Sequence, residues 1–244
     1  MRKELSFIIP CAGKGSRLGS PFPKELFPID KNVTLIDKIF DCIRPFKDKS
    51  QVIIIISEEK YDLIKYLKKY SNDFDIIFVY QKDDLKELCG AIKSASELFS
   101  EKNILLLPDI VLIDDDLNGK FKEFIENDGI ISFLIKEEQD ENILKRMGAM
   151  YVENKKLIST IDKPTLEQIK ENNFNSYWVA FMFKLKYATD FLNNFEKMQK
   201  HEEYDKKYFV NMQTTTVSYA LDLGVWENIR KFYYDLARTI YRNS

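Results

Sequence analysis

Short apolar runs, separated by segments with helical spacing, constrain the fold of this chain more than any other feature. The runs are nearly continuous in apolar character; they are Ser6–Pro10, Val52–Ile56, Ile76–Tyr80, Ile104–Pro108 and Ile130–Ile135. Runs of this length without alternation are typical of strands buried on both faces, as in a parallel sheet. Apolar residues recur on one helical face in the segments Leu35–Ile43, Tyr61–Leu67 and Leu85–Leu98. This alternation predicts an α/β fold with a Rossmann-like, doubly wound mixed sheet and helices on both faces.

The second part of the chain has a less regular pattern. Strands are expected at Ala149–Val152, Leu157–Ile161, Trp178–Lys184 and Thr214–Leu221, and helices at Tyr187–Met198 and Trp226–Arg242. No linker rich in proline, glycine or serine separates the two parts. We therefore expect one domain over residues 1–244, with two halves at 1–135 and 136–244.

The composition excludes several classes of protein. Among 244 residues, 37 Lys and Arg nearly balance 39 Asp and Glu, which argues against a nucleic-acid partner. Three dispersed cysteines predict neither a disulfide framework nor a zinc site, and a single histidine, His201, argues against histidine-dependent catalysis. No apolar run reaches the roughly 20 residues of a membrane span, and the N-terminus leads directly into a strand. We expect a cytoplasmic protein with no membrane partner.

A loop rich in glycine and proline follows the first predicted strand, in the segment SFIIPCAGKGSRLGSPFPKELFPI. Glycines allow backbone N–H groups to approach phosphate oxygens closely, and a loop after a strand is a common phosphate site. The same segment carries three cationic side chains that would also attract phosphate: Lys14, Arg17 and Lys24. The segment therefore predicts a phosphate-binding loop.

Two common phosphate loops do not match this segment. A Walker A loop needs Ser or Thr after Gly-Lys, where this chain has Gly15, and the dinucleotide fingerprint needs a glycine at Leu18. The segment resembles the signature of the sugar-1-phosphate nucleotidyltransferases, Gly-x-Gly-Ser/Thr-Arg-Leu followed by Pro-Lys-x-Leu-x-Pro. The resemblance implies catalytic roles for Arg17 and Lys24. It implies nucleotide binding by Ala12, Gly13, Gly15 and Ser16.

Later segments resemble other landmarks of the same family. Gln81 and Gly90 match the positions that contact the nucleobase, which favours a pyrimidine nucleotide. Asp109 matches the aspartate that holds a catalytic Mg²⁺, although Pro108 replaces the usual glycine before it. Asp222 matches the second Mg²⁺ ligand, in a segment where two neighbouring positions depart from the family pattern. The resemblance thus assigns nucleotide binding to the first half of the domain and acceptor binding to the second.

The acceptor site is less well defined by the sequence. Lys163, which follows Asp162 in place of the family's glutamate, would face the acceptor phosphate as a catalytic residue. Ala180 stands near the position of a glycine that contacts the sugar in the family. Tyr177 and Trp178 precede it and would form an aromatic wall against the acceptor, or alternatively pack in the core of the strand.

The resemblance implies a Mg²⁺-dependent enzyme that joins a nucleoside triphosphate to a sugar-1-phosphate and releases pyrophosphate. One alternative is a cytidylyltransferase acting on a non-sugar acceptor such as phosphocholine or an aminophosphonate. Another is a nucleotide-binding regulator without catalysis. A glycosyltransferase would use the Asp-x-Asp at Asp114–Asp116, which a helix start explains more simply. The aromatic face of the last predicted helix would serve a homodimer or pack on its own domain.

Overall fold

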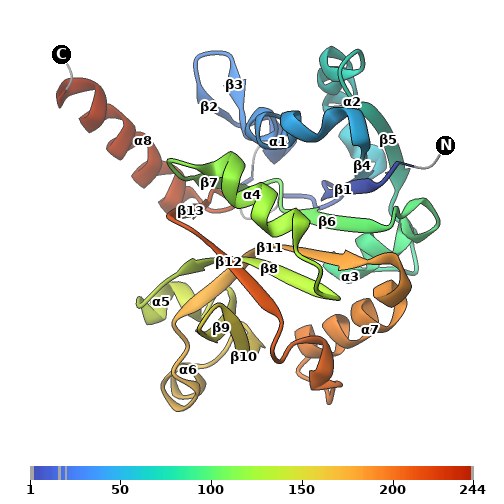
Figure 1. The fold of residues 1–244 in the computed structure, drawn as a ribbon. Helices are drawn as coiled ribbons and strands as arrows, with labels where there is room; N and C mark the ends of the chain where they lie inside the picture. The colour runs from blue at the N-terminus through green and yellow to red at the C-terminus, as the bar shows by residue number, and fades with distance from the viewer. Residues whose placement is uncertain (1–2, 16–17, 20, 243–244) are drawn as a thin grey trace.

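A mixed sheet forms the centre of the computed structural model, which describes residues 3–15, 18–19 and 21–242 (Figure 1). Within these residues the sheet has nine strands in the order β5-β4-β1-β6-β11-β8-β12-β10-β9. The first four in this order are parallel, and β11 is antiparallel to both β6 and β8. The strands are β1 (Leu5–Pro10), β4 (Ser50–Ile56), β5 (Asp75–Tyr80), β6 (Lys102–Leu106), β8 (Ile131–Glu137), β9 (Gly148–Glu153), β10 (Lys156–Asp162), β11 (Ser176–Lys184) and β12 (Gln213–Val217).

Two small antiparallel pairs lie outside the central sheet. One joins β7 (Ile110–Ile113) to β13 (Tyr219–Asp222), and the other joins β2 (Pro28–Asp30) to β3 (Val33–Thr34). The pair β7–β13 brings the residues after β6 against a segment near the end of the chain. This pairing therefore determines which residues, far apart in the sequence, lie next to each other at this edge of the molecule.

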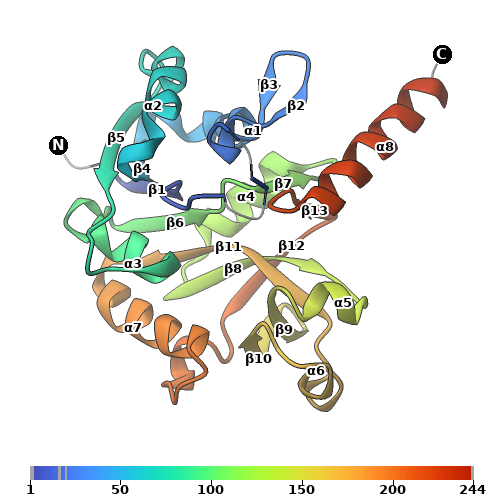
Figure 2. The same cartoon turned by 180° about the vertical axis from the view of Figure 1, so that it is seen from behind.

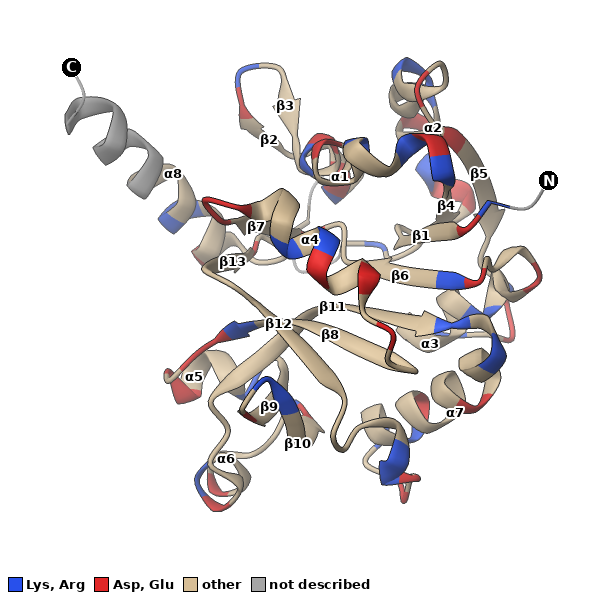
Figure 3. Ribbon diagram, in the orientation of Figure 1, with Lys and Arg blue, Asp and Glu red and all other residues tan. Residues whose placement is uncertain are grey.

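Helices cover both faces of the sheet because successive strand residues point to opposite sides (Figure 2). On one side, Phe7 and Ile54 pack with α1 (Leu35–Ile43), α2 (Tyr61–Leu67) and α4 (Leu117–Glu126). On the other side, Ile8 and Ile53 pack with α3 (Glu87–Ser94) and α7 (Ala188–Gln199). The strands of the central sheet carry few charges, which lie mostly on helices and loops (Figure 3). The remaining helices are α5 (Glu141–Leu144), α6 (Leu166–Asn172), α8 (Trp226–Arg242) and the short 3₁₀ turns η1 (Lys24–Leu26), η2 (Arg44–Lys49), η3 (Glu58–Lys60), η4 (Lys68–Tyr70), η5 (Ser96–Leu98), η6 (Leu185–Tyr187) and η7 (Lys206–Tyr208).

The structure confirms the predicted fold class, adds the short strands β2, β3 and β7, and divides one predicted strand. The predicted strand Thr214–Leu221 is divided into β12 and β13 at Ser218. There the backbone N–H and the hydroxyl of Ser218 both donate to Oδ2 of Asp114 at 2.7 Å. This long-range contact turns the chain from the central sheet to β7.

The central sheet contains strands from both predicted halves of the chain. The predicted boundary between residues 135 and 136 falls inside β8, so the two halves share the sheet, and their division stays a prediction. Across the described ranges, none of the helices has the length and apolar character needed to cross a membrane. The expected cytoplasmic location also stays a prediction.

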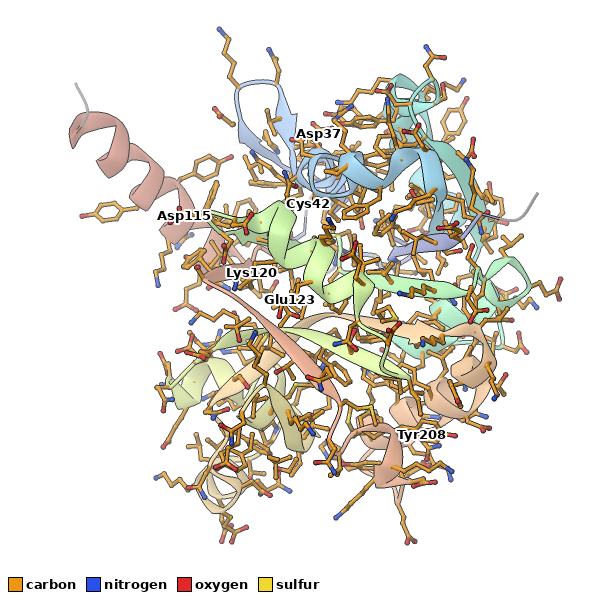
Figure 4. All side chains as sticks on the ribbon, in the orientation of Figure 1. Asp37, Cys42, Asp115, Lys120, Glu123 and Tyr208 are labelled. Carbon is orange, nitrogen blue, oxygen red and sulfur yellow. The ribbon has the colours of Figure 1, made fainter. Side chains whose placement is uncertain are left out.

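Asp37, labelled in Figure 4, is a buried residue in the first turn of α1, and its carboxylate fixes that helix to η4 and the end of α2. Asp37 accepts hydrogen bonds from the backbone N–H of Thr34 at 2.8 Å, from the hydroxyls of Tyr66 and Tyr70 at 2.6 and 2.7 Å, and forms an ion pair with Lys69 at 2.8 Å. Burial alone would raise the pKa of Asp37, but these four donors outweigh it and lower the pKa to about 2. The charged form of Asp37 is therefore the one that the folded protein stabilises.

We predict that Asp37→Asn lowers the free energy of unfolding by about 2 kcal/mol at pH 7, because a pKa depressed below its unfolded value stabilises the fold only while the group is charged. This stabilisation is complete above the unfolded pKa near 3.8 and is lost as the pH falls toward about 2. Urea unfolding at pH 7 and between pH 4 and 2 measures both effects. A wild type and variant that differ equally at pH 7 and pH 2 would contradict the prediction.

Candidate active site

The predicted phosphate loop begins directly at the carboxyl end of β1. The backbone N–H of Cys11 donates to the carbonyl of Ile55 on β4 at 2.7 Å, so the ladder continues one residue beyond the strand. Gly15 has φ +65°, a left-handed conformation that side chains disfavour, and its carbonyl accepts from the N–H of Leu18 at 2.9 Å. The Cys11 thiol is fully buried, and this burial raises its pKa well above the usual value. Cys11 is therefore a small core residue beneath the loop.

The structure places part of the predicted nucleotide-binding set in this loop. Ala12 is buried, whereas Gly13 and Lys14 are exposed, and nothing lies within 4 Å of the position where Gly13 would carry a side chain. Ser16 and Arg17 lie outside the described residues. Their predicted roles in nucleotide binding and catalysis stay predictions.

Lys24 joins the phosphate loop to the end of β6. Its aliphatic stem packs against Gly15, where an added Cβ would lie 3.6 Å from Cβ of Lys24. Its Nζ atom lies 2.6 Å from Oδ2 of Asp109, and the two side chains are only 16% and 13% exposed. Burial opposes the charge on Lys24, but the charge and hydrogen bond of Asp109 outweigh it and raise the pKa of Lys24. The structure thus brings together two residues that the sequence assigned to separate motifs.

Asp222 lies beside Asp109 through the pairing of β13 with β7. Asp222 stands opposite Ile110, and the N–H of Leu223 donates to the carbonyl of Asp109 at 2.7 Å. Oδ1 of Asp222 accepts from the N–H of Gly224 at 2.7 Å, which orients the carboxylate at the turn. The two predicted metal ligands therefore lie at the same end of one strand pair.

These two aspartates fit a magnesium ion that also binds substrate. In the part of the chain that the structure describes, no group of three or more His, Cys, Asp or Glu side chains is placed to hold a metal. Mg²⁺ commonly uses one or two carboxylates and completes its shell with water and substrate phosphates. Asp109 and Asp222 supply oxygen donors of this kind.

Gln81 and Gly90 meet at the loop that follows β5. The side-chain amide of Gln81 donates to the carbonyl of Leu85 at 2.6 Å. A Cβ at Gly90 would lie 2.3 Å from the carbonyl carbon of Leu85, so only glycine permits the loop to pack against α3. Both residues therefore shape the same loop, and their contact with a nucleobase stays a prediction.

Lys163 stands at a separate place, directly after β10. Its backbone has φ +47°, and its N–H donates to the carbonyl of Met147 at 2.9 Å. The exposed ammonium lies 4.0 Å from the carboxylate of Asp162, an ion pair distinct from that of Lys24 and Asp109. Burial raises the pKa of Asp162. The contact predicted between Lys163 and the acceptor phosphate stays a prediction.

The three predicted acceptor-binding residues lie on β11. Tyr177 and Trp178 are 4% and 6% exposed, and Ala180 is fully buried. The hydroxyl of Tyr177 donates to the carbonyl of Ala220, and the indole of Trp178 packs against Phe181 and Phe195. Their acceptor-binding role stays a prediction, and each ring has the core packing that the alternative interpretation describes.

Gly148 has a packing role that the sequence analysis missed. A Cβ at Gly148 would lie 1.8 Å from Nε1 of Trp178, so the absence of a side chain makes room for the indole. Gly148 also pairs with Asp162 across β9 and β10. Gly148 begins the segment GAMYV, directly before the predicted strand, and this position was the signal that could have indicated its packing role.

The Asp-x-Asp of the sequence has a local structural role. Oδ1 of Asp116 accepts from the N–H of Gly119 and begins α4, and Oδ1 of Asp114 accepts from the N–H of Asp116. The other oxygen of Asp114 binds Ser218. The helix start expected from the sequence is confirmed.

A second buried ion pair, between Glu25 and Lys60, holds the residue next to Lys24, and the sequence analysis missed it. Oε2 of Glu25 lies 2.9 Å from Nζ of Lys60 at the end of η3, and the two side chains are 0% and 5% exposed. Burial raises the pKa of Glu25, against the attraction of Lys60. The other oxygen, Oε1, is buried without a hydrogen-bond partner. The pair anchors the residue next to Lys24 to the carboxyl end of β4.

We predict that Lys60→Met lowers the free energy of unfolding by about 3 kcal/mol, because it leaves the Glu25 carboxylate buried without its partner. The double variant Glu25→Leu/Lys60→Met should recover most of this loss, since two apolar side chains need no partner. Denaturant unfolding of both variants gives the comparison. A double variant as unstable as Lys60→Met would refute the assigned origin of the loss.

The fold and the site together define an α/β protein with a glycine-rich loop after β1 and an adjacent pair of aspartates. The chain belongs to the nucleotidyl transferase family, whose model matches residues 7–235. This match covers the signature loop, both metal-ligand candidates and Lys163. It confirms the resemblance found in the sequence.

Curated relatives are distant and longer than this chain. The Bifunctional protein GlmU of Buchnera aphidicola subsp. Schizaphis graminum (strain Sg) is 25% identical over 228 residues, which cover 89% of this chain and 46% of that protein. The Bifunctional protein GlmU of Sulfurimonas denitrificans (strain ATCC 33889 / DSM 1251) is 26% identical over 206 residues, covering 83% and 44%. The chain thus spans about half the length of the curated relatives it matches.

Solved structures share the fold over nearly the whole chain. A UDP-glucose pyrophosphorylase complexed with UDP-glucose has a TM-score of 0.75 at 18% identity, covering 98% of this chain and 100% of that one. A putative glucose-1-phosphate thymidylyltransferase from Bacillus anthracis, in complex with sucrose, has a TM-score of 0.71 at 16% identity, covering 93% of both chains. These similarities confirm the α/β fold and its extent as a single domain.

Proposed function

We propose that this protein is a Mg²⁺-dependent nucleotidyltransferase that joins a pyrimidine nucleoside triphosphate to a sugar-1-phosphate and releases pyrophosphate. The observation that carries this proposal is the contact between Lys24 and Asp109, with Asp222 on the paired strand. Membership of the nucleotidyl transferase family supports the type of reaction. The named activities of the similar structures, on UDP-glucose and glucose-1-phosphate, support the substrate classes.

The proposed reaction needs positioning and charge more than proton transfer. An oxygen of the acceptor phosphate attacks the α-phosphorus, the bond to the β-phosphate oxygen breaks, and pyrophosphate leaves with the bonding electrons. A phosphomonoester has a second pKa near 6, so the nucleophile is already largely deprotonated at neutral pH. This chemistry agrees with a chain whose single histidine is His201. The protein then has to hold two anions in line and balance their charge.

Lys24 is the residue best placed to balance that charge. Its raised pKa keeps the ammonium protonated, and its stem lies against Gly15 of the phosphate loop. In the structure, Asp109 neutralises this ammonium. When a triphosphate enters, Lys24 exchanges a carboxylate for a phosphate oxygen without leaving the loop. Arg17 of the signature would bind the leaving pyrophosphate, and Lys163 would hold the acceptor phosphate.

Asp109 and Asp222 would hold the magnesium ion through their carboxylate oxygens. When bound, Mg²⁺ supplies charge stabilisation at the phosphate oxygens. The bond from Leu223 to the Asp109 carbonyl fixes the backbone of Asp109, and the bond from Gly224 to Oδ1 orients the carboxylate of Asp222, before substrate arrives. Such preorganisation lowers the free energy of reorganisation during the reaction.

The buried positions of Tyr177 and Trp178 favour a sugar phosphate over a quaternary ammonium acceptor. Cation–π recognition needs the face of an aromatic ring in contact with the ligand. Both rings are almost fully buried in the core, and Trp178 contacts other aromatic rings. Membership of the nucleotidyl transferase family favours an enzyme over a regulator that only binds nucleotide.

We predict that Lys24→Met and Asp109→Asn each lower kcat/KM by about 100- to 1,000-fold, because each removes a preorganised charge from the reacting phosphates. Pyrophosphate release is measured over a grid of nucleoside triphosphates against sugar-1-phosphates, phosphocholine and aminophosphonates. Lys207→Met is the matched control, since Lys207 pairs with Asp205 at 2.8 Å on the surface. Wild-type turnover by either site variant would reject the proposed site, and a signal only with phosphocholine would reject the sugar acceptor.

We predict that EDTA abolishes pyrophosphate release, that added Mg²⁺ restores it, and that Asp222→Asn raises the half-saturating Mg²⁺ concentration about tenfold. The expected rise follows from the loss of one of two carboxylate ligands. Asp114→Asn is the control, because asparagine keeps an oxygen that accepts the bonds from Ser218 but removes the negative charge of the Asp-x-Asp. The metal assignment fails if Asp114→Asn, and not Asp222→Asn, changes the Mg²⁺ requirement.

A further inference from the structure

Two polar side chains in the first turn of α8 reach both parts of the proposed nucleotide site. The indole N–H of Trp226 donates to the carbonyl of Leu18 at 2.8 Å. The side-chain amide of Asn228 donates to the carbonyl of Asp222 at 2.6 Å. Leu18 directly follows Arg17 in the signature segment, and Asp222 is a candidate metal ligand. One helical turn therefore binds the phosphate loop and the second metal-ligand element together.

Apolar packing docks α8 independently of these hydrogen bonds. Ile229 is 2% exposed and packs in a cluster that includes Phe27 and Leu223. Phe27 also contacts the ring of Trp226 edge-on, with centroids 5.8 Å apart. The hydroxyl of Tyr233 donates to the carbonyl of Pro28. The loss of one donor in the first turn should thus leave the helix in place.

Two contacts tie Leu18 of the phosphate loop to the rest of the domain. Its side chain is 3% exposed and packs in the cluster with Phe27 and Ile229, and its carbonyl accepts from Trp226. The backbone N–H groups of Leu18 and Gly19 both donate to the carbonyl of Gly15, at 2.9 and 3.3 Å. These two bonds close the loop between Gly15 and Leu18. Gly15 and Gly19 both have left-handed φ values, +65° and +56°, which glycine adopts at little cost. The bond from Trp226 fixes the backbone carbonyl of Leu18 next to Gly19.

We propose that Trp226 and Asn228 are positioning residues for the nucleotide site: Trp226 holds the phosphate loop, and Asn228 holds the backbone of Asp222. The inference rests on the proposed function, since it assigns the loop to the triphosphate and Asp222 to the metal. A loop held in its binding geometry before the ligand arrives avoids the entropy cost of ordering during binding. Each residue therefore acts through a different partner and affects a different ligand.

Trp226→Phe tests the first half of this inference, because it keeps an aromatic ring against Phe27 and removes the N–H donor together with the second ring of the indole. Titration calorimetry with the preferred nucleoside triphosphate and Mg²⁺ should show a Kd about fivefold higher than that of the wild type, as expected for one lost hydrogen bond. The KM for the acceptor should not change. Asn228→Ala should instead raise the half-saturating Mg²⁺ concentration about fivefold.

Asn172→Ala is the matched control for a purely structural effect. The side-chain amide of Asn172 on α6 donates to a backbone carbonyl at 2.8 Å, as that of Asn228 does. All three variants should lower Tm by only a few degrees, while only Trp226→Phe and Asn228→Ala change ligand affinity. An unchanged nucleotide Kd in Trp226→Phe, or a rise that the acceptor KM shares, would overturn the positioning role. A wild type that binds no nucleotide would reject the proposed function itself.

Discussion

The pairing of β13 with β7 is the constraint on which the rest of the site depends. Asp222 becomes a neighbour of Asp109 only because β13 runs antiparallel to β7 and Leu223 donates to the Asp109 carbonyl. The same pairing positions the start of α8 over the signature segment. The turn at Ser218, held by Asp114, directs the chain out of the central sheet to make this pairing possible. The contact between Asp114 and Ser218 thereby influences the geometry at the other end of the strand pair.

Charge is arranged below the phosphate loop so that each buried charge has an opposite partner. Lys24 pairs with Asp109, and the next residue, Glu25, pairs with Lys60. Adjacent residues of η1 thus carry opposite charges. Each pairs with a residue of the opposite charge, one at the end of β6 and the other after β4. Because buried ions are costly without partners, this arrangement allows little movement of η1. Rigidity around Lys24 then follows from electrostatics as much as from apolar packing.

Local sequence patterns predicted much of the fold and part of the site. Repeated apolar spacing gave the bounds of α1, α2 and α8, and the signature loop was recognisable because its residues are consecutive. The short strand β7 was missed, since it directly follows Asp109 and is stabilised by a partner more than 100 residues later. The pair Glu25–Lys60 and the bond from Trp226 to Leu18 likewise join separate segments. These contacts form only in the assembled fold, so the pattern of a single segment does not predict them.

The position of β11 between β6 and β8 has a consequence for the synthesis of the chain. β6 ends at Leu106, and its neighbour β11 begins at Ser176, so the edge of β6 stays unpaired while about 70 further residues are made. At roughly 5–20 residues per second, that interval lasts several seconds. An apolar strand with a free edge can pair with other chains during this time. During this interval a chaperone should determine what fraction of the nascent protein reaches the native state. During refolding of the finished chain, slow dilution should have the same effect.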